Sequence, residues 1–153
     1  MSFSNGDEYY GSWKGGKKEG FGSYKWSDGA YYEGEYKQGR KEGKGTLYFS
    51  NGDKYVGELL NGKRHGRGIE KWKNGEEYDG EWEYDKRNGH GKVVHANGDR
   101  YEGEYKNDEK SGKGLLFYIY FLFFIFTFFF IFTFFTNFFF YKFFRYFLLY
   151  KWL

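Results

Sequence analysis

The feature that most constrains the fold of this chain is an uninterrupted period of 23 residues. Five tyrosines recur at this spacing, each followed two positions later by a glycine and, in four of the five copies, four positions later by an aromatic residue. The columns read Tyr9, Gly11, Trp13; Tyr32, Gly34, Tyr36; Tyr55, Gly57, Leu59; Tyr78, Gly80, Trp82; and Tyr101, Gly103, Tyr105. Self-similarity of this kind predicts a repeat protein in which neighbouring units bury one another.

Each repeat reads as two β-strands. Apolar positions alternate with polar ones in the Tyr-x-Gly-x-aromatic segment, as expected for a strand with one buried face. Repeats are joined at Asn-Gly or Asp-Gly pairs, which supply the positive φ angles of tight hairpin turns; these pairs are Asn5-Gly6, Asp28-Gly29, Asn51-Gly52, Asn74-Gly75 and Asn97-Gly98. We therefore predict an all-β fold, an elongated single-layer antiparallel array of β-hairpins.

The glycines within the predicted strands need a cause, because glycine weakens a strand interior. In one explanation each glycine leaves a flat gap for an aromatic ring from a neighbouring strand. In the other, some of these glycines are bulges or turn ends. Ring packing is favoured for the first-strand column that begins at Gly11, and both explanations stay open for the second-strand columns that begin at Gly20 and Gly22.

The pattern Tyr-x-Gly-x-aromatic followed by Gly-x-Gly resembles the MORN (membrane occupation and recognition nexus) repeat, most clearly from Tyr55 to Gly68. The resemblance covers a partial repeat, 1–8, and the repeats 9–31, 32–54, 55–77, 78–100 and 101–118. The array begins in mid-repeat, so we expect an upstream strand to be missing. Asp85 and Asp108 replace a turn glycine in the last two repeats, and those loops are expected to be looser.

From the charged edge and the apolar tail described below, we expect a non-enzymatic, membrane-associated scaffold or tether whose repeats bind anionic phospholipid or a partner protein. The resemblance also permits a cytoskeletal, ciliary or cell-cortex scaffold that does not bind lipid. A third alternative is a targeting fragment of a larger lipid kinase or methyltransferase. Because the ends of the array are poorly capped, self-association through its sheet edges is a further expectation.

Charge is distributed unevenly along the chain. Residues 1–114 carry 21 basic and 21 acidic residues, so the net charge of +3 lies in the tail and a globally basic nucleic-acid binder is not supported. The loop inside each repeat nevertheless carries adjacent bases, which predict a basic edge that binds lipid or a partner: Lys17, Lys18, Arg40, Lys41, Lys63, Arg64, Lys86, Arg87 and Lys110. The alternative is that these lysines and arginines serve solubility alone. The opposite turns hold acidic residues, Asp7, Asp28, Asp53, Glu76 and Asp99, and predict an acidic edge.

After Tyr118 the repeats stop. Residues 119–141 are uncharged and rich in Phe, and their length is that of a transmembrane helix. The basic and aromatic flank, 142–153, is typical of an interfacial anchor. With no apolar signal segment at its N-terminus, a tail-anchored chain would hold its repeats on the cytosolic face of a membrane. Two other origins stay open for the tail, a translated non-coding sequence and an aggregation-prone soluble segment; in either case the protein would be cytoplasmic or cytoskeletal.

No catalytic constellation is recognisable. The chain has no Cys, and His90 and His95 are five residues apart and would point to opposite faces of a strand, so no metal site and no cofactor are predicted. A glutamate recurs in every full repeat after the first, at Glu35, Glu58, Glu81 and Glu104, which indicates a solvated sheet face. We therefore expect a protein that is not an enzyme.

Overall fold

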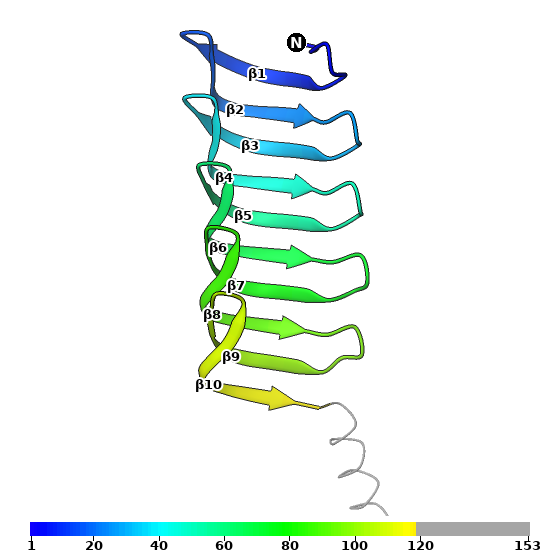
Figure 1. Cartoon of the computed structure of the whole chain (residues 1–153), viewed down its shortest axis with the longest axis vertical. Coiled ribbons are helices and arrows are strands. Elements are labelled where there is room, and N and C mark those ends of the chain that lie inside the picture. Colours follow the sequence, from blue (N-terminus) through cyan, green and yellow to red (C-terminus); the bar gives the residue numbers. More distant parts are fainter. Residues whose placement is uncertain (119–153) are drawn as a thin grey trace, which may run out of the picture. The chain divides into compact units, whose positions relative to one another are not determined.

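The computed structural model describes residues 1–118, and residues 1–116 form one compact unit. Ten antiparallel strands follow one another in a single open sheet, in sequence order from β1 to β10 (Figure 1). Their bounds are β1 Glu8–Lys14, β2 Lys17–Lys25, β3 Tyr31–Lys37, β4 Arg40–Tyr48, β5 Lys54–Leu60, β6 Lys63–Lys71, β7 Glu77–Glu83, β8 Lys86–Val94, β9 Arg100–Lys106 and β10 Glu109–Phe117. The predicted all-β, single-layer hairpin array is confirmed.

The predicted transmembrane segment, 119–141, and its flank, 142–153, lie outside the described residues. Within residues 1–118 the structure contains no helix that could cross a bilayer.

The core is a column of tyrosine rings on one face of the sheet, hereafter the aromatic face. Tyr9, Tyr32, Tyr55 and Tyr78 are at most 1% exposed, and each hydroxyl donates a hydrogen bond of 2.8–3.1 Å to the carbonyl oxygen three residues later. A second column packs edge-on between them: the ring of Tyr36 lies 5.3 Å from both Tyr9 and Tyr32. T-shaped ring contacts stabilise a protein beyond the burial of apolar area alone. The second column therefore stabilises the packing of each repeat against its neighbour.

Two columns of glycine exist because these rings lie flat on the backbone. A Cβ at Gly57 would lie 2.5 Å from the Cα of Gly68 and from the hydroxyl oxygen of Tyr55, and a Cβ at Gly68 would lie 2.3 Å from the same oxygen. Ring packing is thus confirmed for the first-strand glycines and for the second glycine of each even-numbered strand. The ring covers its own strand as well as the neighbouring one, whereas the sequence suggested the neighbour alone.

The remaining strand glycines, which begin at Gly20, form bulges instead. Gly43 has a φ of 71°. Gly34 pairs with Gly45, and the next pair is Tyr36 with Lys41, so β3 uses two residues where β4 uses four. The extra residues bend each even-numbered strand near its beginning (Figure 1). Both explanations proposed for the second-strand glycines are therefore right, each for one column.

The turns between repeats differ from the tight turns that the sequence predicted. In the turn from β2 to β3, Trp26 N–H donates to Ala30 O (3.0 Å) and Gly29 N–H to Trp26 O (3.1 Å). Positive φ is confined to the glycine of each Asn-Gly or Asp-Gly pair. Two consecutive residues with positive φ occur in the turns within repeats, such as Asn61-Gly62, and this is the geometry that suits a two-residue hairpin.

The loops at Asp85 and Asp108 are not looser, and this expectation was wrong. Both aspartates have a φ of 72° and complete the same two-residue turn as the glycines that they replace. Aspartate tolerates this conformation better than most residues do. Each carboxylate also accepts a hydrogen bond from a backbone N–H of the preceding repeat, Asp85 from Arg64 (2.8 Å) and Asp108 from Arg87 (2.9 Å).

Candidate binding surface

The paired bases at the start of each even-numbered strand separate into two columns, because successive side chains of a strand point to opposite sides. The first members are exposed: Lys17, Arg40, Lys63 and Lys86. This set is hereafter the exposed basic column. The second members turn over the aromatic face, where all but Lys110 are partly buried: Lys18, Lys41, Arg64, Arg87 and Lys110. The predicted basic edge is therefore two chemically different arrays.

The second array lies on aromatic rings. The ammonium of Lys18 is 3.8 Å from the ring centre of Tyr24, that of Lys41 is 4.8 Å from Trp26, and the guanidinium carbon of Arg64 is 4.3 Å from Trp82. Arg87 and Lys110 lie over Tyr105 (5.1 Å) and Tyr101 (4.5 Å). At these distances the positive charges are attracted to the ring faces, so these side chains cover the core as well as carry charge.

The arginines of this array also bind carboxylates. Arg64 Nη1 lies 2.5 Å from Glu70 Oε1, and Arg64 Nε lies 3.4 Å from Asp85 Oδ1. Arg87 Nε lies 3.3 Å from Asp108 Oδ1. Burial raises the pKa of the Glu70 carboxyl, and the nearby Arg64 opposes this change.

The net positive charge of the within-repeat turns is concentrated in the first three repeats. Segments 14–19 and 37–42 each contain three bases and one acid, and 60–65 contains two bases, so each has a net charge of +2. Segments 83–88 and 106–111 each contain two bases and two acids and are neutral. The sequence prediction treated the five turns as equivalent and missed this asymmetry, which is visible once acids are counted beside the bases.

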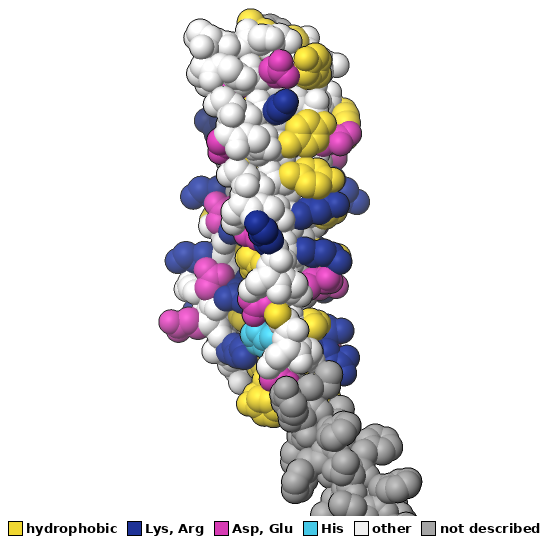
Figure 2. Space-filling model, turned by 90° about the vertical axis from the view of Figure 1, so that its right-hand side faces the viewer, with side chains coloured by type: hydrophobic (Ala, Val, Ile, Leu, Met, Phe, Trp, Pro, Cys, Tyr) yellow, Lys and Arg dark blue, Asp and Glu magenta, His cyan; other side chains and the backbone are white. Residues whose placement is uncertain are grey.

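Carboxylates of the between-repeat turns mostly bind neighbouring turns. Asp7 accepts hydrogen bonds from the Tyr24 hydroxyl (2.6 Å) and Ser27 N–H (2.9 Å), and these bonds lower its pKa. Asp53 accepts from Lys73 N–H (2.9 Å), and Glu76 Oε1 lies 2.7 Å from His95 Nδ1. Figure 2 looks onto this edge and shows hydrophobic, basic and acidic side chains together.

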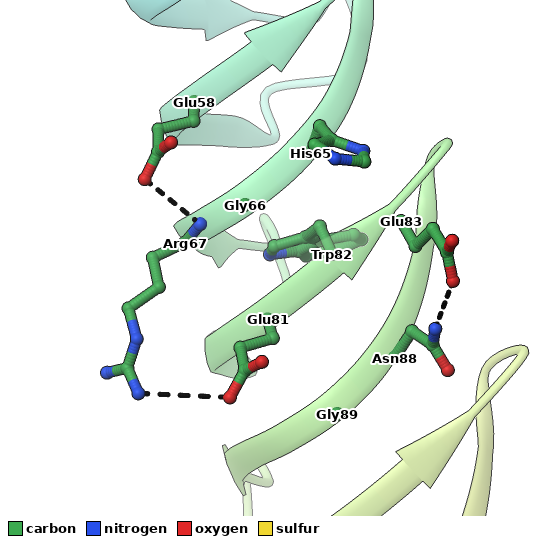
Figure 3. A pocket seen from close by; sticks show the side chains of 9 residues that line it. All are labelled: Glu58, His65, Gly66, Arg67, Glu81, Trp82, Glu83, Asn88 and Gly89. Atoms are coloured by element: carbon green, nitrogen blue, oxygen red, sulfur yellow. Dashed lines mark hydrogen bonds and ion pairs between the residues drawn. The ribbon is translucent and has the colours of Figure 1, made fainter.

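The recurring glutamates lie over the bulges, a role that the sequence prediction missed. Glu35 and Glu58 accept hydrogen bonds from the N–H groups of Lys44 (3.1 Å) and Arg67 (3.3 Å). Glu58 and Arg67 line the 520 Å³ hollow of Figure 3. There the backbone N–H of Arg67 binds Glu58 while its guanidinium forms an ion pair with Glu81, and Asn88 donates a hydrogen bond to Glu83. The signal that could have found this role is the constant position of each glutamate, eight residues before a bulge glycine.

The predicted core residues lie on the aromatic face, and among their aromatic side chains Trp13 alone is exposed. Trp13 is 43% exposed because β1 is the first strand of the sheet, and its ring contacts Tyr9 at 5.2 Å. Leu59, which replaces the aromatic residue in repeat three, is also buried, but it has no ring to extend the series of T-shaped contacts. Among the described residues, no group of three or more His, Cys, Asp or Glu side chains could hold a metal ion.

Comparison with known proteins gives one family. The model of the MORN repeat matches five consecutive segments, 9–31, 32–54, 55–77, 78–100 and 101–118, which together make up more than half of the chain. No curated protein matches the chain.

Proposed function

This chain belongs to the MORN repeat family, and we propose that it is a non-enzymatic scaffold that binds an anionic phospholipid surface through its exposed basic column. The observation that carries this proposal is the distribution of charge: the first three within-repeat turns each have a net charge of +2 and lie in one line. Successive turns are two strands apart, about 10 Å. A row of this kind can meet a flat charged surface at several points at once.

The size of the effect follows from the number of bases that reach the surface. Each lysine or arginine near an anionic bilayer contributes about 1 kcal/mol. Lys17, Arg40 and Lys63 are exposed, and Lys14 and Lys37 are exposed beside them. Their joint contribution supports reversible binding that weakens as ionic strength rises.

A non-catalytic role is supported by how the recurring carboxylates are used. Glu35 and Glu58 bind backbone N–H groups at bulges, and Asp7 and Asp53 bind the next turn. Carboxylates that accept hydrogen bonds from the backbone in this way stabilise the repeat array. Attachment to the cytosolic face of a membrane through residues 119–141 is an additional proposal, tested by whether the full chain stays with membranes after a carbonate wash.

Co-sedimentation of the full chain with vesicles tests the lipid proposal. Vesicles of phosphatidylcholine alone are compared with vesicles that also contain phosphatidylserine, so that only the charge-dependent part of binding is scored. We expect Lys17→Glu, Arg40→Glu and Lys63→Glu together to abolish the phosphatidylserine-dependent fraction. The matched control reverses Lys25, Lys44 and Lys92, which are exposed elsewhere, and should retain most of it. Equal loss in both triple variants would contradict a role for this column.

A protein partner is the second candidate function. It is favoured by hollows on the aromatic face that carry both apolar and basic side chains, one of them about 490 Å³ with Trp26, Leu47 and Phe49 in its wall. Such a surface offers contact area that a flat membrane could not reach.

A further inference from the structure

In the last repeats, an arginine on the aromatic face binds a carboxylate supplied by the turn of the next repeat, and the first repeats lack this carboxylate. Asp85, in the turn between β7 and β8, binds the backbone N–H and the side chain of Arg64, one repeat earlier. Asp108 binds Arg87 in the same way. In both cases a base on the aromatic face receives a carboxylate from the turn of the next repeat.

Glycine occupies the aspartate position opposite Lys18 and Lys41. The turn itself is in the same place: Gly39 N–H donates to Lys18 O (2.9 Å) and Gly62 N–H to Lys41 O (2.8 Å), as Asp85 N–H donates to Arg64 O (3.0 Å). A Cβ at Gly39 or Gly62 would meet nothing closer than 3.9 Å. The turns of the first repeats thus have the same backbone geometry as those of the last repeats, but they carry no carboxylate next to the lysine.

Lys18 and Lys41 are therefore partly buried cations without an ion pair among residues 1–118. Burial lowers the pKa of both ammonium groups, while Asp7 and Asp85 oppose this change from a distance. Both of those carboxylates already accept other hydrogen bonds, Asp7 from Tyr24 and Asp85 from Arg64. A partly desolvated cation gains more from an incoming anion than an exposed lysine does.

Apolar surface adjoins the two lysines. A hollow of about 260 Å³ contains Lys18, Tyr24 and Lys41, and the 490 Å³ hollow continues from it through Trp26 and Lys41 to Leu47 and Phe49. Inorganic phosphate would use the cations and leave these apolar side chains uncovered. A peptide with carboxylate and apolar side chains would use both.

We propose that Lys18 and Lys41 bind two carboxylates of an extended acidic segment of a partner protein, whose apolar side chains fill the hollow beside Trp26, Leu47 and Phe49. The two ammonium groups belong to consecutive repeats, about 10 Å apart. A polyproline II segment has three residues per turn and rises about 3.1 Å per residue, so its residues i and i+3 lie on one side about 9 Å apart. The partner motif is accordingly acidic–apolar–x–acidic–apolar. This proposal is independent of lipid binding through the exposed basic column.

The test measures fluorescence anisotropy of a labelled peptide, Pro-Glu-Leu-Pro-Glu-Leu-Pro, titrated with the full chain. The matched peptide carries Gln in place of both Glu residues. In the protein, Gly39→Asp with Gly62→Asp supplies the carboxylates that the later repeats already possess. The control pair, Gly16→Asp with Gly75→Asp, adds the same charge at positive-φ glycines that have open space and lie outside the two sites.

We expect the Glu peptide to bind at least about tenfold more tightly than the Gln peptide, a difference that one charge-assisted hydrogen bond can supply. Gly39→Asp with Gly62→Asp should remove this preference, and the control pair should keep most of it. Both pairs place aspartate at positive-φ glycines, so the first pair should lower the melting temperature no more than the control pair does. Lys18→Met with Lys41→Met, which retains the apolar stem, should also remove it.

Three results would overturn the proposal. Equal binding of both peptides, or no binding, would show that the lysines do not select a carboxylate peptide. Equal loss in the two aspartate pairs would show a general charge effect. Binding to phosphatidylserine vesicles that is lost in Gly39→Asp with Gly62→Asp, without peptide binding, would assign the sites to lipid headgroups. Loss of vesicle binding in the Lys17, Arg40 and Lys63 variant, with peptide binding kept, is the result expected when both this inference and the lipid proposal are right.

Discussion

At the scale of single residues, the chain depends on glycines that are required for two different reasons. Gly57 and Gly68 have no Cβ because the ring of Tyr55 lies against their backbone. Gly43 and Gly66 are required for a left-handed backbone at the bulge, with φ of 71° and 61°. The sequence marks both kinds by the same 23-residue spacing and favours ring packing only for the first-strand column, which includes Gly57. It does not separate Gly66 from Gly68, because that difference arises from the register between strands.

Gly57→Ala and Gly75→Ala separate crowding from backbone strain. A Cβ at Gly57 would lie 2.5 Å from the Cα of Gly68 and from the hydroxyl oxygen of Tyr55, so the strands must move apart, whereas Gly75 has open space and a φ of 91°. We expect Gly57→Ala to lower the free energy of unfolding by about 3 kcal/mol or more, from overpacking, and Gly75→Ala by only about 1 kcal/mol, from the left-handed backbone. Urea denaturation measures both, and equal costs would contradict the packing account.

At the scale of strands and turns, side-chain carboxylates connect one repeat to the next. Asp7 holds the first between-repeat turn against the second through Tyr24 and Ser27, and Asp53 holds the third against the fourth through Lys73. Strand existence, order and the aromatic face all followed from the sequence, because alternation and spacing determine them. These connections did not, because the hydrogen bond from the Ser27 N–H to the Asp7 carboxylate spans 20 residues and depends on how the turns stack.

The pKa of Asp7 gives this connection a pH dependence. The folded-state pKa is lowered from 3.8 by the hydrogen bonds from Tyr24 and Ser27, so ionised Asp7 stabilises the fold above pH 3.8. This stabilisation should decrease as pH falls below 3.8 and be absent below the folded pKa. Asp7→Asn should melt at a lower temperature than the wild type at pH 7, with the difference narrowing toward pH 3 in circular dichroism melts. A difference that stays constant over that range would contradict the assignment.

At the scale of the whole array, stability should be the sum of repeats and the contacts between them. Repeat three contributes Leu59 where the others have an aromatic ring, while repeat four contributes Trp82, whose ring contacts both Tyr55 (5.6 Å) and Tyr78 (5.1 Å). Deleting 23 residues preserves every column, so each shortened chain should fold.

Deletion of 55–77 should therefore lower the melting temperature less than deletion of 78–100. The first deletion removes Leu59 and leaves Trp82 to pack between Tyr32 and Tyr78, whereas the second removes Trp82 and keeps Leu59. Thermal melts of the two shortened chains, which are equal in length, make the comparison. The reverse order would show that the edge-on rings are not the main contact between repeats.

The claim on which the binding proposals rest is that equivalent side chains stand in line, one repeat spacing apart. Because the chain has no Cys, spin labels can be placed at single introduced cysteines and their separation measured by double electron–electron resonance. Lys17→Cys paired with Lys63→Cys spans two repeats and should give about 19 Å, and Lys17→Cys paired with Lys86→Cys spans three and should give about 29 Å. Two distances that differ by one repeat spacing would support the account. Equal distances, or a shorter one for the pair that spans three repeats, would contradict it.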